Sequence, residues 1–142
     1  MKENQLYLEF PSIPSNESLA RLIVAAFASA LDPTIEEISD IKSAVTEAVT
    51  NCIIHGYPNC VGTIIMRLEI QDQTLYIEII DEGVGIHDLH QAMQPLYTSR
   101  PDLERAGMGF SFMEAFMDNL KVTSELGKGT AVYMSKKVEN NY

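Results

Sequence analysis

Three polar residues of different chemistry follow one another at helical spacing in the segment TEAVTNCIIHG, residues 46–56. Glu47, Asn51 and His55 stand four residues apart, so a helix places a carboxylate, an amide and an imidazole in one row. Such a row beside a buried face can meet a ligand, but an exposed polar stripe with a histidine near the helix end has the same spacing. Apolar residues at three-and-four spacing predict the buried face: Ile41, Ala44, Val45, Ala48, Val49, Cys52 and Ile53.

The motif DEGVG, residues 81–85, joins an acidic residue to two closely spaced glycines at the end of a strand-like run. Gly83 and Gly85 remove two side chains and allow the backbone to approach a flat ligand closely. Asp81 beside them could accept a hydrogen bond from an exocyclic amine such as that of adenine. A simple Asp-Glu-Gly turn is the alternative reading of the motif.

Two further glycine motifs follow nearer the C-terminus. GMGF places Gly107 and Gly109 just before a predicted helix, where free backbone N–H groups and the helix dipole favour a phosphate. A flexible loop end is the alternative there. GKGT, residues 127–130, lacks the earlier glycine that the phosphate-binding motif GxxxxGK[ST] requires. It therefore predicts a hairpin turn, from which Thr130 can reach a ligand.

The remaining histidines do not predict a zinc site. His87 and His90 have HxxH spacing, but no cysteine, histidine or acidic cluster at metal-site spacing accompanies them. The two cysteines, Cys52 and Cys60, form no CxxC pair and are too few for a disulfide framework, so reduced thiols are expected.

Charge and composition narrow the possible partners. The 142-residue chain has 20 acidic and 10 basic residues and a net charge of −10. This charge argues against direct nucleic-acid or acidic-membrane binding, and it suits a basic partner or a cation that holds a polyanion. The N-terminus has no signal-peptide pattern, and no apolar run approaches the ~18 residues of a spanning helix. A cytoplasmic protein is therefore expected.

Two helices are predicted ahead of the glycine motifs. Asn16 is expected to cap the first, which runs to about Leu31. Thr34 and Glu37 form a capping-box pattern that begins the second helix, and Gly56 ends it. The predicted apolar face of the first helix consists of Leu19, Leu22, Ile23, Ala26, Phe27 and Ala30.

The rest of the chain predicts strands, two shorter helices and a loop at 94–107. The strands are expected at 6–10, 62–71, 74–81, 120–125 and 130–137, and the helices at 88–93 and 109–118. Helices inserted between runs of strands predict an α/β fold, a two-layer sandwich of one mixed sheet with its helices on one face. Residues 1–142 are expected to form a single domain.

The ordered set E-x-x-x-N, DxGxG, GxG and GxGT resembles the GHKL (Bergerat) nucleotide-binding fold of histidine-kinase catalytic domains, gyrase B and Hsp90. More narrowly, the whole chain resembles the anti-sigma switch kinases of spore-forming bacteria. The segments that carry this likeness are NESLARLIVAAFASALDPT, EAVTNCIIHGY, DEGVGI, QPLYTSRPDLERAGMGF and KGTAVY. A shorter YPNCVG turn is a departure that affects none of these motifs.

The resemblance implies a Mg²⁺- and ATP-dependent serine kinase. Glu47 would be the catalytic base, Asn51 would coordinate Mg²⁺, and Asp81 would contact the adenine of ATP or ADP. Residues 94–107 would form a lid over the phosphates. The resemblance assigns further nucleotide contacts to Gly83, Gly85, Arg105, Gly107, Gly109 and Thr130.

The resemblance also implies protein partners. These are a sigma factor held inactive, with the sporulation factor sigma F expected, and an anti-anti-sigma factor that is the kinase substrate; the family further suggests a homodimer. A general-stress (sigma B type) switch kinase and a nucleotide-gated binding module without kinase activity are the alternatives. Glu17 and Arg21, one turn apart on the first helix, are candidate partner contacts, although a surface ion pair explains them equally well.

Overall fold

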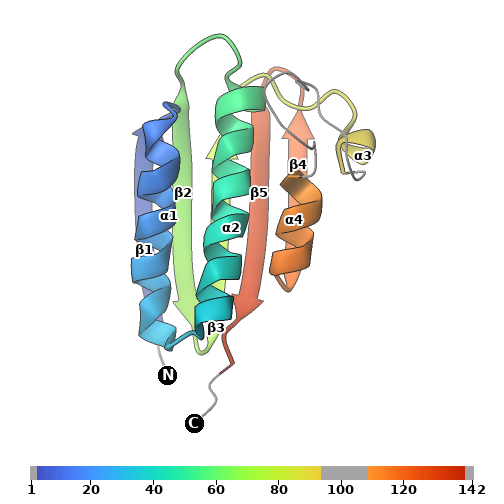
Figure 1. The fold of residues 1–142 in the computed structure, drawn as a ribbon. Coiled ribbons are helices and arrows are strands. Elements are labelled where there is room, and N and C mark those ends of the chain that lie inside the picture. The colour runs from blue at the N-terminus through green and yellow to red at the C-terminus, as the bar shows by residue number, and fades with distance from the viewer. Residues whose placement is uncertain (1–2, 94–108, 140–142) are drawn as a thin grey trace.

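The computed structural model describes residues 3–93 and 109–139, and the strands in these ranges form one five-stranded sheet (Figure 1). The strand order is β1-β2-β3-β5-β4, and each neighbouring pair is antiparallel. The strands are β1 Glu3–Pro11, β2 Thr63–Gln71, β3 Thr74–Asp81, β4 Asn119–Glu125 and β5 Gly129–Lys137.

The prediction of a mixed sheet is wrong, for a topological reason. The chain passes from β3 through a helix to β4, and such a crossover places two strands parallel to each other. However, β5 folds back from β4 and lies between them, so both β3 and β4 pair with β5 in antiparallel fashion. Two successive helices between β1 and β2 likewise return the chain to the end where β1 stopped, which makes this pair antiparallel (Figure 1).

The long helices all cover one face of the sheet, as predicted, and give a two-layer α/β fold (Figure 1). A 3₁₀ turn, Ser29–Leu31, follows the first helix, and a π-helical turn called η2, Cys52–Gly56, continues the second. The α-helices are α1 Ser15–Ala28, α2 Ile35–Asn51, α3 Leu89–Ala92 and α4 Gly109–Phe116.

The two predicted helix starts have different outcomes. The capping box of α2 is confirmed: the Glu37 N–H donates to Thr34 Oγ1 at 3.0 Å, and the Thr34 N–H donates to Glu37 Oε1 at 2.8 Å. The predicted Asn16 cap is wrong, because α1 begins at Ser15 after Pro14. Asn16 instead donates from Nδ2 to the Pro11 carbonyl at 2.9 Å and ties the helix to the end of β1.

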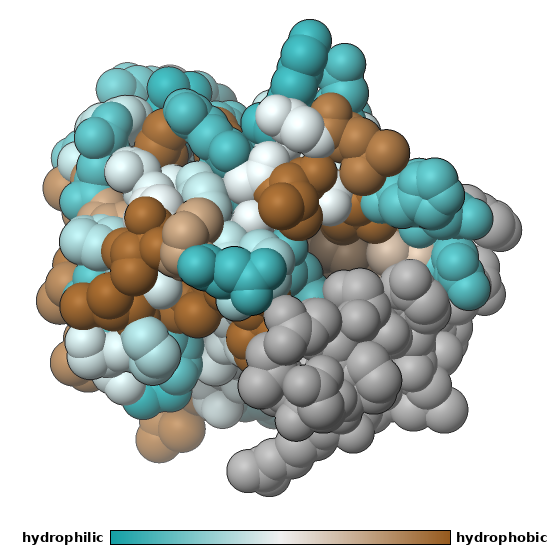
Figure 2. Space-filling view, turned by 90° about the horizontal axis from the view of Figure 1, so that it is seen from above, coloured by the Kyte–Doolittle hydropathy of each residue, from teal (hydrophilic) through white to brown (hydrophobic). Residues whose placement is uncertain are grey.

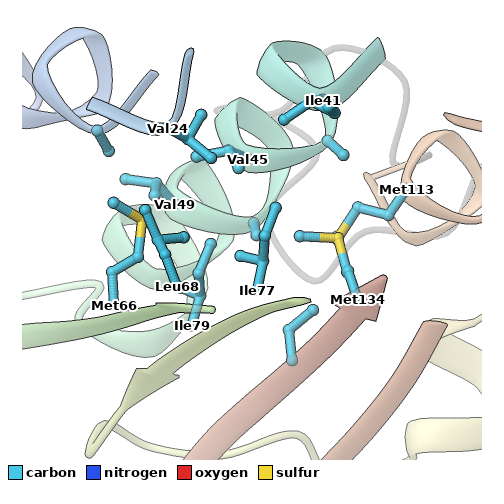
Figure 3. Close-up of a cluster of buried hydrophobic side chains, with 14 of the residues drawn as sticks. Val24, Ile41, Val45, Val49, Met66, Leu68, Ile77, Ile79, Met113 and Met134 are labelled. Atoms are coloured by element: carbon cyan, nitrogen blue, oxygen red, sulfur yellow. The ribbon is translucent and has the colours of Figure 1, made fainter. Parts of the chain in front are cut away.

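The hydrophobic core lies between the helices and the sheet (Figure 3). The predicted α2 face is buried, apart from the half-buried Ile53, and alternating residues of β2 and β3 are buried as well, with Ile41, Val45 and Met66 fully enclosed. The predicted face of α1 is partly wrong, because only Ile23 and Phe27 of its six residues pack against the core, and these two are half-buried. That helix packs through small residues four apart, Ala20, Val24 and Ala28, which allow close approach to α2. The larger Leu19 and Leu22 remain 44% and 63% exposed.

Two further predictions concern compartment and redox state. None of the helices in the described ranges combines the length and the apolar character that crossing a bilayer requires. Cys52 and Cys60 are both free thiols, the former buried and the latter exposed in the turn after η2.

Candidate functional site

A cavity of about 350 Å³ opens at the C-terminal end of α2. Its walls come from η2, the end of β3, the loop that follows β3, the start of α4 and the β4–β5 hairpin. Figure 2 looks down on this end of the molecule, where apolar side chains reach the surface. Five of the predicted site residues line the cavity: Asn51, Asp81, Gly85, Gly109 and Thr130.

Asp81 is the buried carboxylate of this cavity, with only 4% of the residue exposed. Its Oδ1 accepts a hydrogen bond of 2.9 Å from the Gly83 N–H. Burial raises the pKa of Asp81 above its usual range, while hydrogen bonds from the Gly83 N–H, the Cys52 thiol and the Thr130 N–H oppose that shift. A buried carboxylate of this kind is a strong acceptor for an N–H donor on a ligand.

Two glycines allow η2 to approach the loop that follows Asp81. A Cβ on Gly56 would stand 2.8 Å from the Asp81 carboxylate, and a Cβ on Gly83 would stand 1.9 Å from the Gly56 carbonyl oxygen. The Val84 N–H donates to that same Gly56 oxygen at 2.9 Å. Gly83 thus holds the loop close to η2 and to Asp81, although it does not itself line the cavity.

The opposite wall is fixed by the β4–β5 hairpin, which the GKGT motif correctly predicted. Gly85 has φ +77°, and a Cβ there would meet the Glu125 carbonyl oxygen at 2.3 Å. The Gly127 N–H donates to the Val84 carbonyl at 2.9 Å, so the turn of the hairpin is bonded to the DEGVG loop. Thr130 Oγ1 lies 2.8 Å from Ser124 Oγ at the base of the hairpin.

The lining of the cavity combines apolar surface with few polar groups, as is usual for sites that hold small ligands. Val84 and Leu126 at its rim are 49% and 58% exposed. A flat heterocycle with an amine fits this donor and acceptor set, because apolar faces would enclose its ring and Asp81 would accept from its N–H. The apolar lining residues are Ile79, Val84, Ile86, Phe110, Leu126 and Val132.

Two predicted site residues in the described ranges, Glu47 and Gly83, do not line the cavity. Glu47 is half-buried on α2, one turn before Asn51, and does not line the cavity. Arg105 and Gly107 lie outside the described residues, as does the predicted lid at 94–107.

Several lining residues were not predicted. His55 lines the cavity, although its position at the end of the helix was the only role predicted for it. It stands in η2, where the Tyr57 N–H donates to the Cys52 carbonyl at 3.0 Å, a bond that spans five residues. The signal available was its place four residues after Asn51. Cys52 also lines the cavity, and its apolar pattern predicted only a core position.

Comparisons with known proteins agree with this geometry. The model of the histidine kinase-like ATPase domain family matches residues 10–136. The anti-sigma F factor of Clostridium acetobutylicum is 60% identical over 137 residues, which are 96% of this chain and 96% of that protein. The anti-sigma F factor of Caldanaerobacter subterraneus is 59% identical over 138 residues, which are 97% of this chain and 96% of that protein.

A solved structure supports the fold. The crystal structure of the RsbU and RsbW domains of a Mycobacterium tuberculosis protein superposes with a TM-score of 0.68 at 16% identity. The match covers 95% of this chain and 32% of that longer chain, and at this identity it is a likeness of fold alone. On the strength of the sequence matches, the chain belongs to the anti-sigma F factor family, within the histidine kinase-like ATPase domains.

Proposed function

We propose that this protein is a cytoplasmic anti-sigma factor that holds sigma F inactive and, as a Mg²⁺- and ATP-dependent serine kinase, phosphorylates its anti-anti-sigma antagonist. The observation that carries the proposal is the cavity at the end of α2, where Asn51 and the buried Asp81 line one apolar pocket. Family membership supports it, because the relatives of nearly equal length are named anti-sigma F factors.

Asp81 is the proposed acceptor for the exocyclic amine of adenine. One carboxylate oxygen already accepts from the Gly83 N–H, and the second carboxylate oxygen can accept from a ligand. Gly83 and Gly85 let the loop after Asp81 approach the Gly56 and Glu125 carbonyl oxygens, which holds this loop beside the proposed adenine site.

The phosphates are proposed to lie toward α4. Gly109 is the first residue of that helix, so its N–H belongs to the unpaired donors that favour an anion. Arg105 and Gly107, assigned from the sequence resemblance, precede it in the chain and would add a cation and a further backbone donor. Thr130, across the cavity, offers a hydroxyl.

Asn51 is the proposed protein ligand of Mg²⁺. Within residues 3–93 and 109–139, no group of three or more His, Cys, Asp and Glu side chains is arranged to hold a metal ion. A cation here would therefore take most of its oxygens from phosphate and water, as Mg²⁺ commonly does. When bound, Mg-ATP supplies the γ-phosphoryl group.

Glu47 is the proposed general base, one helical turn before Asn51. From this position its carboxylate would accept the proton of the attacking serine hydroxyl. A protein that only binds nucleotide has no need of a base there. The alternative of a nucleotide-gated binding module is therefore tested at this residue.

The decisive experiment is phosphate transfer from labelled ATP to the anti-anti-sigma protein by wild type and Glu47→Gln. Glutamine keeps the shape of the side chain but takes up no proton, so the rate should fall by roughly 10²–10⁴-fold. ATP affinity, measured by direct titration, should remain close to wild type. Asn51→Asp is the contrasting variant, because it changes the charge beside Mg²⁺ and should disturb both affinity and rate. Transfer by Glu47→Gln at the wild-type rate would leave the binding module as the better account.

Partner binding is proposed for the outer surface of α1. Arg21 Nη1 and Glu17 Oε1 form a 2.9 Å ion pair there, beside the exposed Leu22. Arg21→Glu reverses one charge of the pair and should reduce recovery of sigma F and of the anti-anti-sigma protein in a pull-down. Unchanged recovery of both would make the pair a local helix contact, and recovery of a sigma B type factor in place of sigma F would favour the general-stress alternative. A homodimer is part of the proposal, and its mass in solution tests it.

A further inference from the structure

Tyr57 is a buried tyrosine whose hydroxyl joins two strand ends beside the cavity. It follows η2 directly and is 8% exposed. Its hydroxyl donates to the Thr63 carbonyl at 2.7 Å and accepts from the Glu82 N–H at 2.7 Å. Its ring lies against Gly62, where an added Cβ would stand 2.2 Å from a ring carbon.

The two groups that this hydroxyl joins would otherwise be partners in the sheet. Pairing between β2 and β3 ends at Ile64 and Asp81, so Thr63 and Glu82 are the next opposed residues. Hydrogen-bonding pairs alternate along an antiparallel ladder. If the pair that closes the two-residue turn, Gln71 and Thr74, is a bonding pair, Thr63 and Glu82 are due to be one as well. The tyrosine oxygen stands in place of that direct bond.

The bridge formed by the Tyr57 hydroxyl sets the direction of the chain after Asp81. With the hydroxyl between them, the strands separate at this point, and the loop turns toward η2. There the Val84 N–H reaches the Gly56 carbonyl at 2.9 Å. The same turn places the Gly83 N–H on the Asp81 carboxylate at 2.9 Å.

We propose that Tyr57 is a positioning residue for adenine recognition: its hydroxyl replaces the last β2–β3 ladder bond and so holds Asp81 and the following loop in the geometry that accepts the adenine amine. This inference rests on the proposed function of the cavity. The tyrosine hydroxyl can donate one hydrogen bond and accept another at the same time. A phenylalanine ring would fill the same space but could not bridge Thr63 and Glu82. Burial raises the pKa of Tyr57, which keeps the hydroxyl protonated and able to donate at neutral pH.

The test compares two nucleotides that differ at one group. Mg-ATP and the Mg complex of purine riboside triphosphate, which lacks the 6-amino group, are titrated by calorimetry into wild type and Tyr57→Phe. The variant should lose about tenfold in affinity for ATP, the size of one well-placed hydrogen bond, and should keep its affinity for the analogue within about twofold. Tyr76→Phe is the matched control: it removes the same atom from a 43% exposed tyrosine on β3 and should change neither affinity.

The titrations test the role of Tyr57 and the contact between Asp81 and adenine separately. An equal loss for both nucleotides, or no loss, would overturn the positioning role of Tyr57 while wild type still prefers ATP. If wild type binds both nucleotides equally, the proposed contact between Asp81 and adenine is itself absent, and the Tyr57 inference falls with it.

A second measurement is independent of how Tyr57→Phe folds. Amide hydrogen exchange in wild type should show the Glu82 N–H protected by its bond to the hydroxyl. Exchange of that amide as fast as an exposed loop amide would overturn the bridge.

Discussion

The two ends of α2 differ in how their terminal backbone groups are used. Both ends of a helix leave backbone groups without intrahelical partners. At the N-terminal end, Thr34 and Glu37 satisfy each other's N–H groups, and Glu37 Oε2 also accepts from the Glu139 N–H at 2.8 Å. At the C-terminal end the helix widens into η2, and its residues contact the Asp81 loop and line the cavity. The N-terminal end is thus capped by its own side chains, whereas the C-terminal end faces the cavity proposed to bind a ligand.

The carboxyl groups of Glu37 and Asp81, one at each end of α2, have pKa values shifted in opposite directions. Burial would raise the pKa of Glu37, but hydrogen bonds from the backbone N–H groups of Thr34 and Glu139 outweigh it, and the pKa is lowered. For Asp81, burial outweighs the hydrogen bonds, and the pKa is raised. Stabilising contacts thus surround the carboxylate at the structural end, whereas the carboxylate at the cavity end is held at a cost to stability. Such a cost is common where groups are kept for binding.

Gly83→Ala is expected to have the largest effect on stability and on ATP binding. Its new contacts lie only at the cavity end of α2. The new Cβ would stand 1.9 Å from the Gly56 carbonyl oxygen, and no side-chain rotation relieves a contact with backbone. Unfolding in urea should show a loss of about 3 kcal/mol. ATP binding should fall below detection by calorimetry.

Gly127→Ala is the matched control for that change. Gly127 also belongs to the cavity end and has φ +79°, but an added Cβ there meets nothing within 4 Å. Only the strain of a left-handed backbone remains, about 1 kcal/mol, so stability should fall less and ATP should still bind. Equal behaviour of the two variants would show that the approach of η2 to the loop has no special importance.

Thr34→Ala should have a smaller effect, confined to the other end of the helix. It removes the oxygen that accepts from the Glu37 N–H, and loss of such a cap costs about 1 kcal/mol. Thermal unfolding should shift accordingly, while the affinity for ATP stays at the wild-type value. A clear loss of ATP affinity would mean that the two ends are coupled through α2 and that their contrast is not a division of roles.

The smallest effects are the pH dependences of stability, which should have opposite signs at the two ends. For Glu37, whose pKa is lowered from 4.5, stability is present above pH 4.5 and is lost as the pH falls through the folded pKa. For Asp81, whose pKa is raised from 3.8, stability is lost as the pH rises from 3.8 through the folded pKa. Urea unfolding of Glu37→Gln and Asp81→Asn across this range, each against wild type, should give differences that change with pH in opposite directions. Stability differences that change with pH in the same direction for both variants would contradict the proposed contrast between the two ends of α2.

Sequence patterns predicted the features that depend on neighbours along the chain. Thr34 and Glu37 are three residues apart, the strands predicted at 62–71 and 74–81 are neighbours along the chain, and the hairpin at GKGT is equally local. Local hydrogen bonds and the spacing of apolar residues are sufficient for such predictions. The grouping of Asn51, Asp81 and Thr130 in one site came instead from the family resemblance, and all three line the cavity.

Features that depend on distant contacts were missed. The antiparallel sheet follows from β5 lying between β3 and β4, which no local signal in the chain reveals. The buried face of α1 was partly misassigned because close packing on α2 favours small residues over the larger leucines. The proposed role of Tyr57 depends on Thr63 and Glu82, and Glu82 is 25 residues away. The spacing of apolar residues within one segment contains no information about partners that are distant along the chain.

The central claim is that the cavity end of α2 binds ATP and that Asp81 recognises its adenine. Calorimetric titration of Mg-ATP into wild type and Asp81→Asn tests it most directly. Wild type should bind, and Asp81→Asn, which replaces a charged acceptor by a neutral amide, should bind about ten- to a hundredfold more weakly. Equal affinity of the two proteins for ATP would contradict the account and remove Asp81 from the binding site.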